Sequence, residues 1–259
     1  MDPVRTVTTV SISQADDSAF RALSDASAAI EDLDEACIVG GQMVALLCEA
    51  FPSSGVLLRR TSDADAGIDP VIAAAGTLHD RLVDAGYSAL RGNHYELDDR
   101  VIDILVTSAS GRFESAEYGG RAFDGAPGLH LALVDPLRIG IEVTLMGGSV
   151  LAFSTRVPRV EGALVLKALA FDSRHSEKDL VDLFNLLEIR DSHSSDAIGG
   201  WRIGTAGGGG ARRDTAEVLH RLARGARSNR MLREADIPAA RFVYLVRAHV
   251  AESTARAGR

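Results

Sequence analysis

The sequence of 259 residues contains little cysteine, almost no lysine and no long apolar segment. Its two cysteines, Cys37 and Cys48, are too few for a disulfide-rich scaffold or a four-cysteine zinc site. No apolar run approaches the roughly 18 residues that a membrane-spanning helix needs. The first twenty residues lack a basic start followed by an apolar core, so no secretory signal is expected. These absences predict a cytoplasmic protein with reduced thiols and no membrane contact.

Lysine is the rarest charged residue. Of the 28 basic residues only two are lysines, Lys167 and Lys178, and they lie within twelve positions of each other. A general preference for arginine follows base composition, but a compact ammonium group is not interchangeable with a guanidinium where space is tight. The pair therefore indicates a site that needs a point charge, with chance clustering as the alternative.

The charge is distributed unevenly along the chain. The formal net charge is −8, yet residues 201–259 hold twelve arginines and five acids. An acidic body followed by a basic segment predicts a polyanionic partner for that segment. The alternative is that the basic segment packs on the acidic body of its own chain.

The content of 46% hydrophobic and 25% charged residues is typical of a globular protein, and the length allows one or two domains. Apolar periodicity predicts helices and strands. The helices are expected at 16–35, 42–51, 70–86, 159–171, 177–189, 212–227 and 238–252. The strands are expected at 36–39, 55–61, 87–97, 100–107, 129–134, 138–145 and 149–155. A loop is expected at 111–128, a polar linker at 191–200 and a glycine-rich hinge at 204–210. This order predicts an α+β domain followed by a helical domain.

The strongest local motif is a pair of acids two positions apart. Asp63 and Asp65 would share one face of a strand, where their charges repel unless a cation lies between them. Carboxylate oxygens suit Mg²⁺, and Asp103, an acid within an apolar run, is the candidate for a third ligand. The structural alternatives are an acidic turn without metal and a buried Asp103 paired with an arginine.

A glycine pair precedes the expected helix 42–51. Gly40 and Gly41 separate it from the apolar run 36–39. Glycines at this place let backbone N–H groups approach a phosphate at a helix N-terminus. A tight turn without any ligand is the alternative.

A third motif surrounds the two lysines. Lys167 lies in an apolar helix, where it either extends to solvent or reaches a triphosphate. The spacing of Ser176 and Asp179 fits a capping box. Asp179 and Asp182 are three residues apart and share a helix face, and Lys178 with Asp182 could form a surface ion pair.

Taken in order, these motifs resemble the nucleotidyltransferase-like AbiEii/AbiGii toxin family, within the DNA polymerase β-type nucleotidyltransferase superfamily. The resemblance covers about residues 36–190. Its matching residues are Gly40, Gly41, Arg59, Thr61, Asp63, Asp65, Asp103, Lys167, Arg174, Lys178, Asp179 and Asp182. The superfamily often has Gly-Ser where this chain has Gly-Gly, although Gly-Gly is familiar in this branch. Residues 108–156 find no match in the resemblance, and the segment from 201 lies outside it.

The resemblance implies a nucleotidyltransferase-like mixed sheet with flanking helices in a catalytic domain over 1–156, which includes the N-terminal helix. A helical domain with the basic segment would follow over 157–259. It also implies transfer of NMP from an NTP to an acceptor, with pyrophosphate released. Asp63, Asp65 and Asp103 would bind Mg²⁺, with two ions expected, and Asp103 would activate the acceptor hydroxyl.

The resemblance also assigns the nucleotide-binding groups and the partners. Lys167 and Arg174 would neutralise the triphosphate, while Lys178 and Asp179 would contribute to nucleotide binding with Gly40, Gly41, Arg59 and Thr61. Family members act as toxins of type IV toxin–antitoxin systems, and some modify the 3′ end of tRNA. The expected partners are therefore an NTP, an RNA acceptor and a cognate antitoxin. A small-molecule or protein acceptor, and a non-catalytic binding module of the same fold, are the alternatives.

Overall fold

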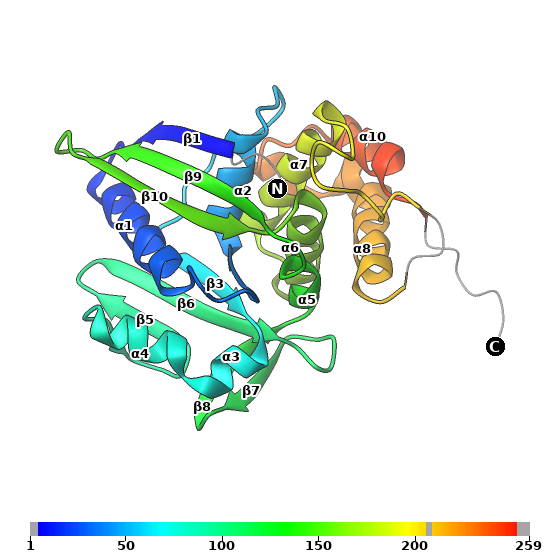
Figure 1. Cartoon of the computed structure of the whole chain (residues 1–259). Coiled ribbons are helices and arrows are strands. Elements are labelled where there is room, and N and C mark those ends of the chain that lie inside the picture. Colours follow the sequence, from blue (N-terminus) through cyan, green and yellow to red (C-terminus); the bar gives the residue numbers. More distant parts are fainter. Residues whose placement is uncertain (1–4, 206–208, 253–259) are drawn as a thin grey trace. The chain divides into compact units, whose positions relative to one another are not determined.

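A computed structural model describes residues 5–205 and 209–252 of the chain (Figure 1). It has mixed β-sheets with flanking helices and then a region of helices alone, which confirms the predicted α+β class. The chain divides into two units. The first comprises Met1–Ala50 and Leu58–Pro158, and the second comprises Phe51–Leu57 and Arg159–Arg259.

The larger sheet of the first unit is mixed. Its strands are β2 (Ala36–Val39), β3 (Ala64–Ile68), β6 (Arg100–Thr107), β5 (His94–Leu97) and β4 (Ser88–Ala89), in that order, with β8 (Arg121–Ala126) on β6 and β7 (Glu114–Tyr118) on β8. The pairs β3–β6 and β6–β8 are parallel. The pairs β2–β3, β4–β5, β5–β6 and β7–β8 are antiparallel.

Strand β6 shows why one face of this sheet is core and the other is available for chemistry. Ile102, Ile104 and Val106 are buried, while Asp103 between them lies on the opposite, half-exposed face. This two-residue period is that of a strand with one face packed against the core.

A smaller sheet contains β1 (Arg5–Val10), β9 (Leu137–Thr144) and β10 (Val150–Val157), with β1 parallel and β10 antiparallel to β9. Helix α1 (Gln14–Ala29) lies between this sheet and the larger one (Figure 1) and contacts β10 and β6. Ser27 donates a hydrogen bond to Thr155 at 2.8 Å, which joins the buried face of α1 to β10. Helix α2 (Gly40–Ala50) contacts β1, β2 and β3.

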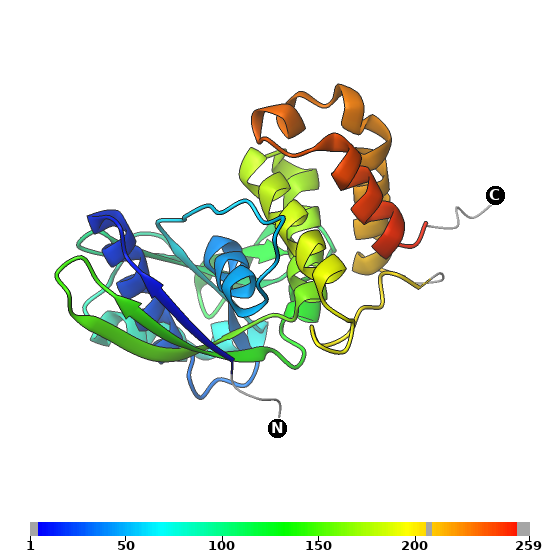
Figure 2. The same ribbon diagram turned by 90° about the horizontal axis from the view of Figure 1, so that it is seen from above.

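The second unit is a cluster of helices. They are α6 (Val160–Arg174), α7 (Glu177–Ser192), α8 (Ala211–Gly225), the 3₁₀ turn η1 (Ala226–Ser228), α9 (Arg230–Glu234) and α10 (Ala239–His249). Figure 2 shows α8, in orange, beside α10, in red. Helix α8 contacts α6, helix α10 contacts α7, and α8 and α10 contact each other. Phe184, Phe242 and Leu245 are completely or almost completely buried in this unit.

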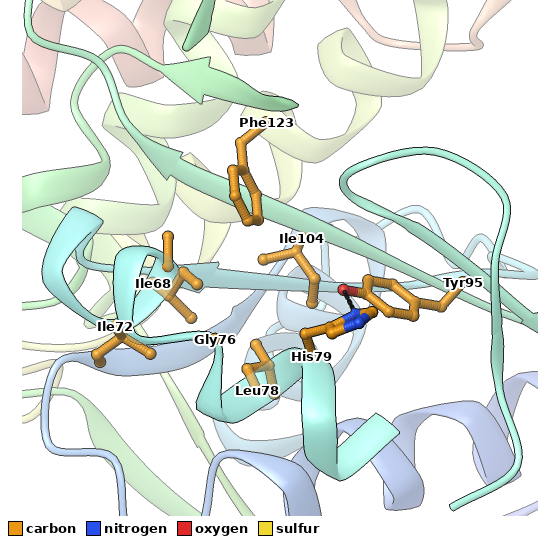
Figure 3. A pocket seen from close by; sticks show the side chains of 9 residues that line it. Ile68, Ile72, Gly76, Leu78, His79, Tyr95, Ile104 and Phe123 are labelled. Carbon is orange, nitrogen blue, oxygen red and sulfur yellow. Dashed lines mark hydrogen bonds between the residues drawn. The ribbon is translucent and has the colours of Figure 1, made fainter. Parts of the chain in front are cut away.

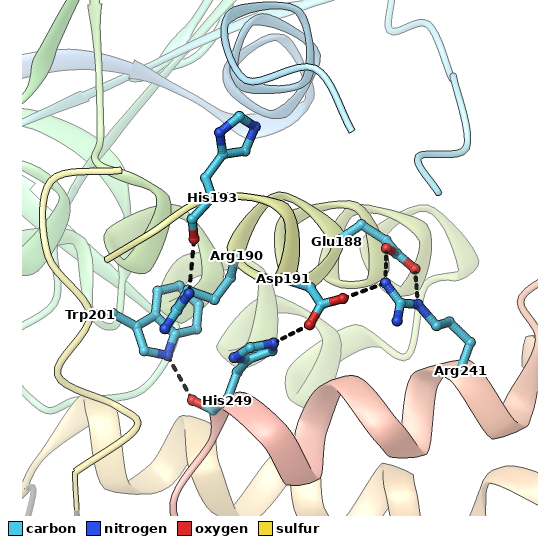
Figure 4. Close-up of polar contacts among 7 residues, drawn as sticks. All are labelled: Glu188, Arg190, Asp191, His193, Trp201, Arg241 and His249. Atoms are coloured by element: carbon cyan, nitrogen blue, oxygen red, sulfur yellow. Dashed lines mark hydrogen bonds and ion pairs between the residues drawn. The ribbon is translucent and has the colours of Figure 1, made fainter. Parts of the chain in front are cut away.

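A polar network ties α7 to α10 and the segment before α8 (Figure 4). Arg241 donates to both oxygens of the buried Glu188, at 2.7 and 2.6 Å, and to Asp191 at 2.7 Å. His249 lies 2.6 Å from the other oxygen of Asp191, and its carbonyl accepts from Trp201 at 2.7 Å. Arg241 of α10 therefore packs on acids of its own unit.

Two more arginines of the basic segment are paired in the same way. Arg212 donates to Glu161 of α6 at 2.6 Å, and Arg221 pairs with Asp172. For these residues the structure favours the interpretation that the basic segment packs on acids of its own chain. Residues 206–208 of the expected hinge and 253–259 of the basic segment lie outside the described residues.

Several predicted elements are wrong. Residues 55–61 form no strand, because the backbone N–H and C=O of Leu57 bond to the side chain of Asn185 instead of a neighbouring strand. The expected strand 129–134 is a short helix, α5 (Leu129–Ala132), which begins after Gly128 in the left-handed region and buries Leu129 and Ala132.

The expected loop 111–128 is the β7–β8 hairpin, whose two-residue turn is Gly119-Gly120 with positive φ at both positions. The expected helix 70–86 is divided at Gly76, which has φ +74°, into α3 (Pro70–Ala75) and α4 (Thr77–Asp84). Strand 87–97 is likewise interrupted, into β4 and β5. Helix 16–35 ends at Ala29, and β1 and α9 were not expected.

No helix within the described ranges 5–205 and 209–252 is both long and apolar enough to cross a lipid bilayer. Cys37 and Cys48 are free cysteines, and both are buried.

Candidate metal centre

Three acidic side chains meet at one edge of the larger sheet. Asp65 in β3 is directly opposite Asp103 in the parallel register with β6. Asp63 lies two residues before Asp65. Directly opposed residues project from the same face of a sheet, so the register itself brings these carboxylates together.

The three carboxylates form a compact cluster. One oxygen of each acid lies within 4.8 Å of the others, and all three residues are half-buried. Three negative charges so close repel one another strongly in a partly buried place. Hard oxygen donors in this number suit Mg²⁺ or a similar divalent cation, so the donor set fits the metal that the sequence predicts. The arrangement can hold a metal ion.

The glycine pair lies against this cluster. Gly40 begins α2 with φ +67°, and a Cβ at this position would overlap the carboxylate of Asp65. A Cβ on Gly41 would come within 2.9 Å of the Thr61 hydroxyl and 3.0 Å of a guanidinium nitrogen of Arg59. The glycines therefore allow the acids and the segment before β3 to approach the N-terminus of α2, where anions are favoured.

Thr61 and Arg59 are thus part of the same neighbourhood. The Thr61 hydroxyl donates to one oxygen of Asp63 at 2.5 Å. This bond fixes the carboxylate of Asp63, which lies in an irregular segment before β3 and would otherwise be free to rotate.

The sequence reasoning missed His94 and Glu96. His94 is opposite Asp103 in the antiparallel pair β5–β6, so Asp65, Asp103 and His94 form one row across three adjacent strands. Nδ1 of His94 lies 2.7 Å from Asp103 and Nε2 lies 3.0 Å from Glu96. Hydrogen bonds to Glu96 and then to Asp103 raise the pKa of His94 above its ordinary value of 6.5.

A signal for His94 was present in the sequence. Asp98-Asp99 is typical of a turn, and a two-residue turn fixes the register of a hairpin. Counting back from that turn pairs Leu97 with Arg100 and therefore His94 with Asp103, as the structure has it.

A polar cavity of about 320 Å³ opens beside Asp103. It is lined by Leu90, Arg91, Asn93, His94, Glu96, Asp103 and Asp124. Acidic side chains, a basic side chain and an amide line this space, so it offers hydrogen-bond donors and acceptors for a hydroxyl-bearing molecule.

A second cavity, on the core face of the same sheet, has a different character (Figure 3). It measures about 10 Å³, enough for a single water molecule, and Ile68, Ile104 and Phe123 contribute to its lining. Its polar group is the contact between His79 Nδ1 and the Tyr95 hydroxyl at 3.1 Å. We assign this cavity to the core.

The other predicted site residues belong to the second unit. Lys167 Nζ lies 2.7 Å from Asp182 and 3.5 Å from Asp179, and both acids are completely buried. Arg174 donates to both oxygens of Asp179, at 2.6 and 2.7 Å. Within this unit, Lys167, Arg174, Asp179 and Asp182 therefore form one ion-pair network between α6 and α7.

Two local interpretations of this segment are corrected. Ser176 is the N-cap of α7, but its side chain makes no capping bond, and the Asp179 carboxylate binds Arg174 and Lys167 instead. Asp182 pairs with Lys167 and is no surface partner of Lys178. Lys178 is exposed.

Comparisons of this chain with protein families, with curated proteins and with solved structures found no match. The candidate site therefore has to be argued from its own geometry. That geometry establishes an acidic triad that could bind a metal ion.

Proposed function

We propose that the protein is a Mg²⁺-dependent nucleotidyltransferase that transfers NMP from an NTP to a hydroxyl of an acceptor. The observation that carries this proposal is the triad Asp63, Asp65 and Asp103, whose oxygens lie within 4.8 Å of one another. Its position beside the Gly40-Gly41 start of α2 adds backbone N–H groups that suit a phosphate.

Bound between these acids, Mg²⁺ would neutralise the triphosphate and polarise the α-phosphoryl group. The N-terminus of α2 would bind phosphate oxygens, and Thr61 would hold Asp63 in place. The acceptor hydroxyl would form a bond to the α-phosphorus while the bond to the leaving pyrophosphate breaks, and the hydroxyl proton would go to a carboxylate oxygen of Asp103. The polar cavity beside Asp103 supports the approach of an acceptor from that side.

Lys167 and Arg174, the two basic residues assigned to the triphosphate, have different surroundings, which support different roles. Lys167 is 5% exposed and is bound to two buried acids, which supports a structural role. The Arg174 side chain is 61% exposed although it binds Asp179. We therefore retain Arg174 as the candidate for contact with the triphosphate.

We further propose RNA as the acceptor and a toxin role with a cognate antitoxin, both on the strength of the sequence resemblance. The exposed arginines of the C-terminal helices, among them Arg224, Arg227 and Arg233, support a polyanionic partner. These residues differ from Arg212, Arg221 and Arg241, which are paired with acids of the second unit.

The test is transfer of radiolabelled α-phosphate from each NTP, with Mg²⁺, to total RNA, to protein or to neither. Asp63→Asn and Asp103→Asn should reduce transfer and pyrophosphate release at least about a hundredfold, because each removes a charge that holds the metal. Asp84→Asn, a change of an exposed acid at the end of α4, is the matched control and should leave the rate unchanged. Equal rates in all variants would contradict the proposed site.

A further inference from the structure

We propose that His94 is a positioning residue that fixes the carboxylate of Asp103 in the metal centre, and that Glu96 in turn holds His94. This inference rests on the proposed function, because it concerns the same triad. It adds two residues that lie outside the predicted motifs and assigns each of them a role.

The backbone register places these groups. His94 is directly opposite Asp103, and His94 and Glu96 are two positions apart in β5, so all three project from the same face of the sheet. Hydrogen bonds join the same groups, with His94 Nε2 lying 3.0 Å from Glu96 Oε1 and His94 Nδ1 lying 2.7 Å from Asp103 Oδ1. Each ring nitrogen therefore has one carboxylate partner.

The carboxylate of Asp103 needs such a support. A β-carboxylate rotates easily about its last bond, and repulsion from Asp63 and Asp65 would turn it away from the cluster. An N–H at Nδ1 of His94 holds Oδ1 in one orientation, and Glu96 fixes the plane of the ring. Hydrogen bonds of this kind to metal-binding carboxylates set metal affinity because they determine where the ligand oxygen points.

The position of His94 also bears on the cavity beside the triad. His94, Glu96 and Asp103 all line this space of about 320 Å³, and the His94 side chain is 28% exposed. Loss of the imidazole would enlarge this space. The same ring therefore orients the acid and forms part of the wall of the cavity beside it.

Two amide substitutions distinguish positioning of Asp103 from a general effect on the strand. In His94→Asn the side-chain amide can take the place of Nδ1 and donate to Asp103. In His94→Gln the amide reaches the place of Nε2 and contacts Glu96 instead. His94→Ala removes both bonds, and thermal unfolding of each variant reports whether the fold is kept.

The measurement is binding of Mn²⁺ to the full-length protein, followed by the EPR signal of the free ion. His94→Ala and His94→Gln should weaken Mn²⁺ binding by about 10- to 100-fold, whereas His94→Asn should stay within about threefold of the original protein. In the transfer assay the same two variants should lower kcat and leave the KM for NTP nearly unchanged.

The outcomes separate the two proposals. If Asp63→Asn and Asp103→Asn lose Mn²⁺ binding while His94→Ala retains it, or if the Asn and Gln variants bind equally, the role of His94 is overturned and the metal centre stands. If the original protein binds Mn²⁺ no better than Asp63→Asn, the metal centre itself is overturned, and the role of His94 with it.

Discussion

Asp65 and Asp103 face each other across the parallel pair β3–β6, although they are 38 positions apart in the sequence. Because aspartate side chains are short, the main-chain register of β3 and β6 decides which side chains lie opposite each other. The candidate metal centre is therefore a property of the sheet, and changes that disturb the backbone beside it should weaken metal binding as strongly as changes of the acids.

Gly40→Ala should weaken metal binding without altering any ligand. The new methyl group would overlap the Asp65 carboxylate, and Gly40 has φ +67°, which costs a non-glycine residue about 1 kcal/mol or more. We expect weaker Mn²⁺ binding and a lower free energy of unfolding. Gly147→Ala, where a methyl group meets open space, is the control. Equal Mn²⁺ affinity for both variants would contradict the close packing of Gly40 on Asp65.

Lys167→Met should destabilise the protein by about 3–5 kcal/mol, because it leaves Asp182 buried without its partner at 2.7 Å. Urea unfolding measures the change. Lys178→Met, at an exposed position, should alter the free energy of unfolding by no more than about 0.5 kcal/mol. Replacing both partners, in Lys167→Met with Asp182→Leu, should recover part of the loss. An unchanged stability of Lys167→Met would rule out the ion-pair role.

Asp191 should make stability depend on pH in the acid range. Its burial opposes ionisation, but hydrogen bonds from His249 and Arg241 outweigh that effect and lower the pKa of Asp191 below 3.8. A lowered carboxylate pKa stabilises the fold above about pH 3.8 and loses this contribution as the pH falls through the folded-state value. The unfolding free energies of the original protein and Asp191→Asn should therefore differ at pH 6 and converge below pH 3.8.

The control for this prediction is Asp196→Asn, a change of an exposed acid shortly after α7. Its difference from the original protein should be small and independent of pH. A difference for Asp191→Asn that persists unchanged to the lowest pH would show that the ionised carboxylate contributes nothing to the network of Figure 4.

Charge reversal of exposed arginines tests the polyanionic partner better than removal of the segment after residue 200. Residues of α8 and α10 form part of the core of the second unit, so truncation would remove the buried Leu219 and Phe242 and expose the faces of α6 and α7 that these helices contact. Arg224→Glu with Arg227→Glu should weaken RNA binding and reduce its dependence on salt by about one to two counterions. Filter binding at several salt concentrations measures this slope, with Arg241→Lys as a paired-arginine control. An unchanged slope would show that these two arginines are exposed but do not bind RNA.

Local patterns were sufficient for the elements with strong periodicity. Apolar alternation predicted β6, β9 and β10, and apolar helical spacing predicted α6 and α7, because in each case the residues that must be buried follow one period. Asp69-Pro70 is typical of a helix start, and α3 begins there, with Asp69 accepting a hydrogen bond from the backbone N–H of Val71 at 2.8 Å.

Local patterns failed where a distant contact satisfied the backbone. The run 55–61 has the composition of a strand, but the main chain of Leu57 bonds to Asn185, which lies 128 residues away. The hairpin β7–β8 differs from the expected loop 111–128 for another reason. Glycine and polar residues are typical of a loop, but Gly119-Gly120 form a specific two-residue turn between two strands.

The sequence by itself determined the chemical groups of the candidate site: an acid pair two residues apart, a third acid within an apolar strand and a glycine pair before a helix. Only the tertiary structure decided that the third acid is opposed to the pair on one side and to His94 on the other, and that Lys167 is bound to Asp182. The reason is physical. Residue type and spacing fix which face a side chain occupies, but the pairing of strands and the packing of helices fix which side chains from distant segments share that face.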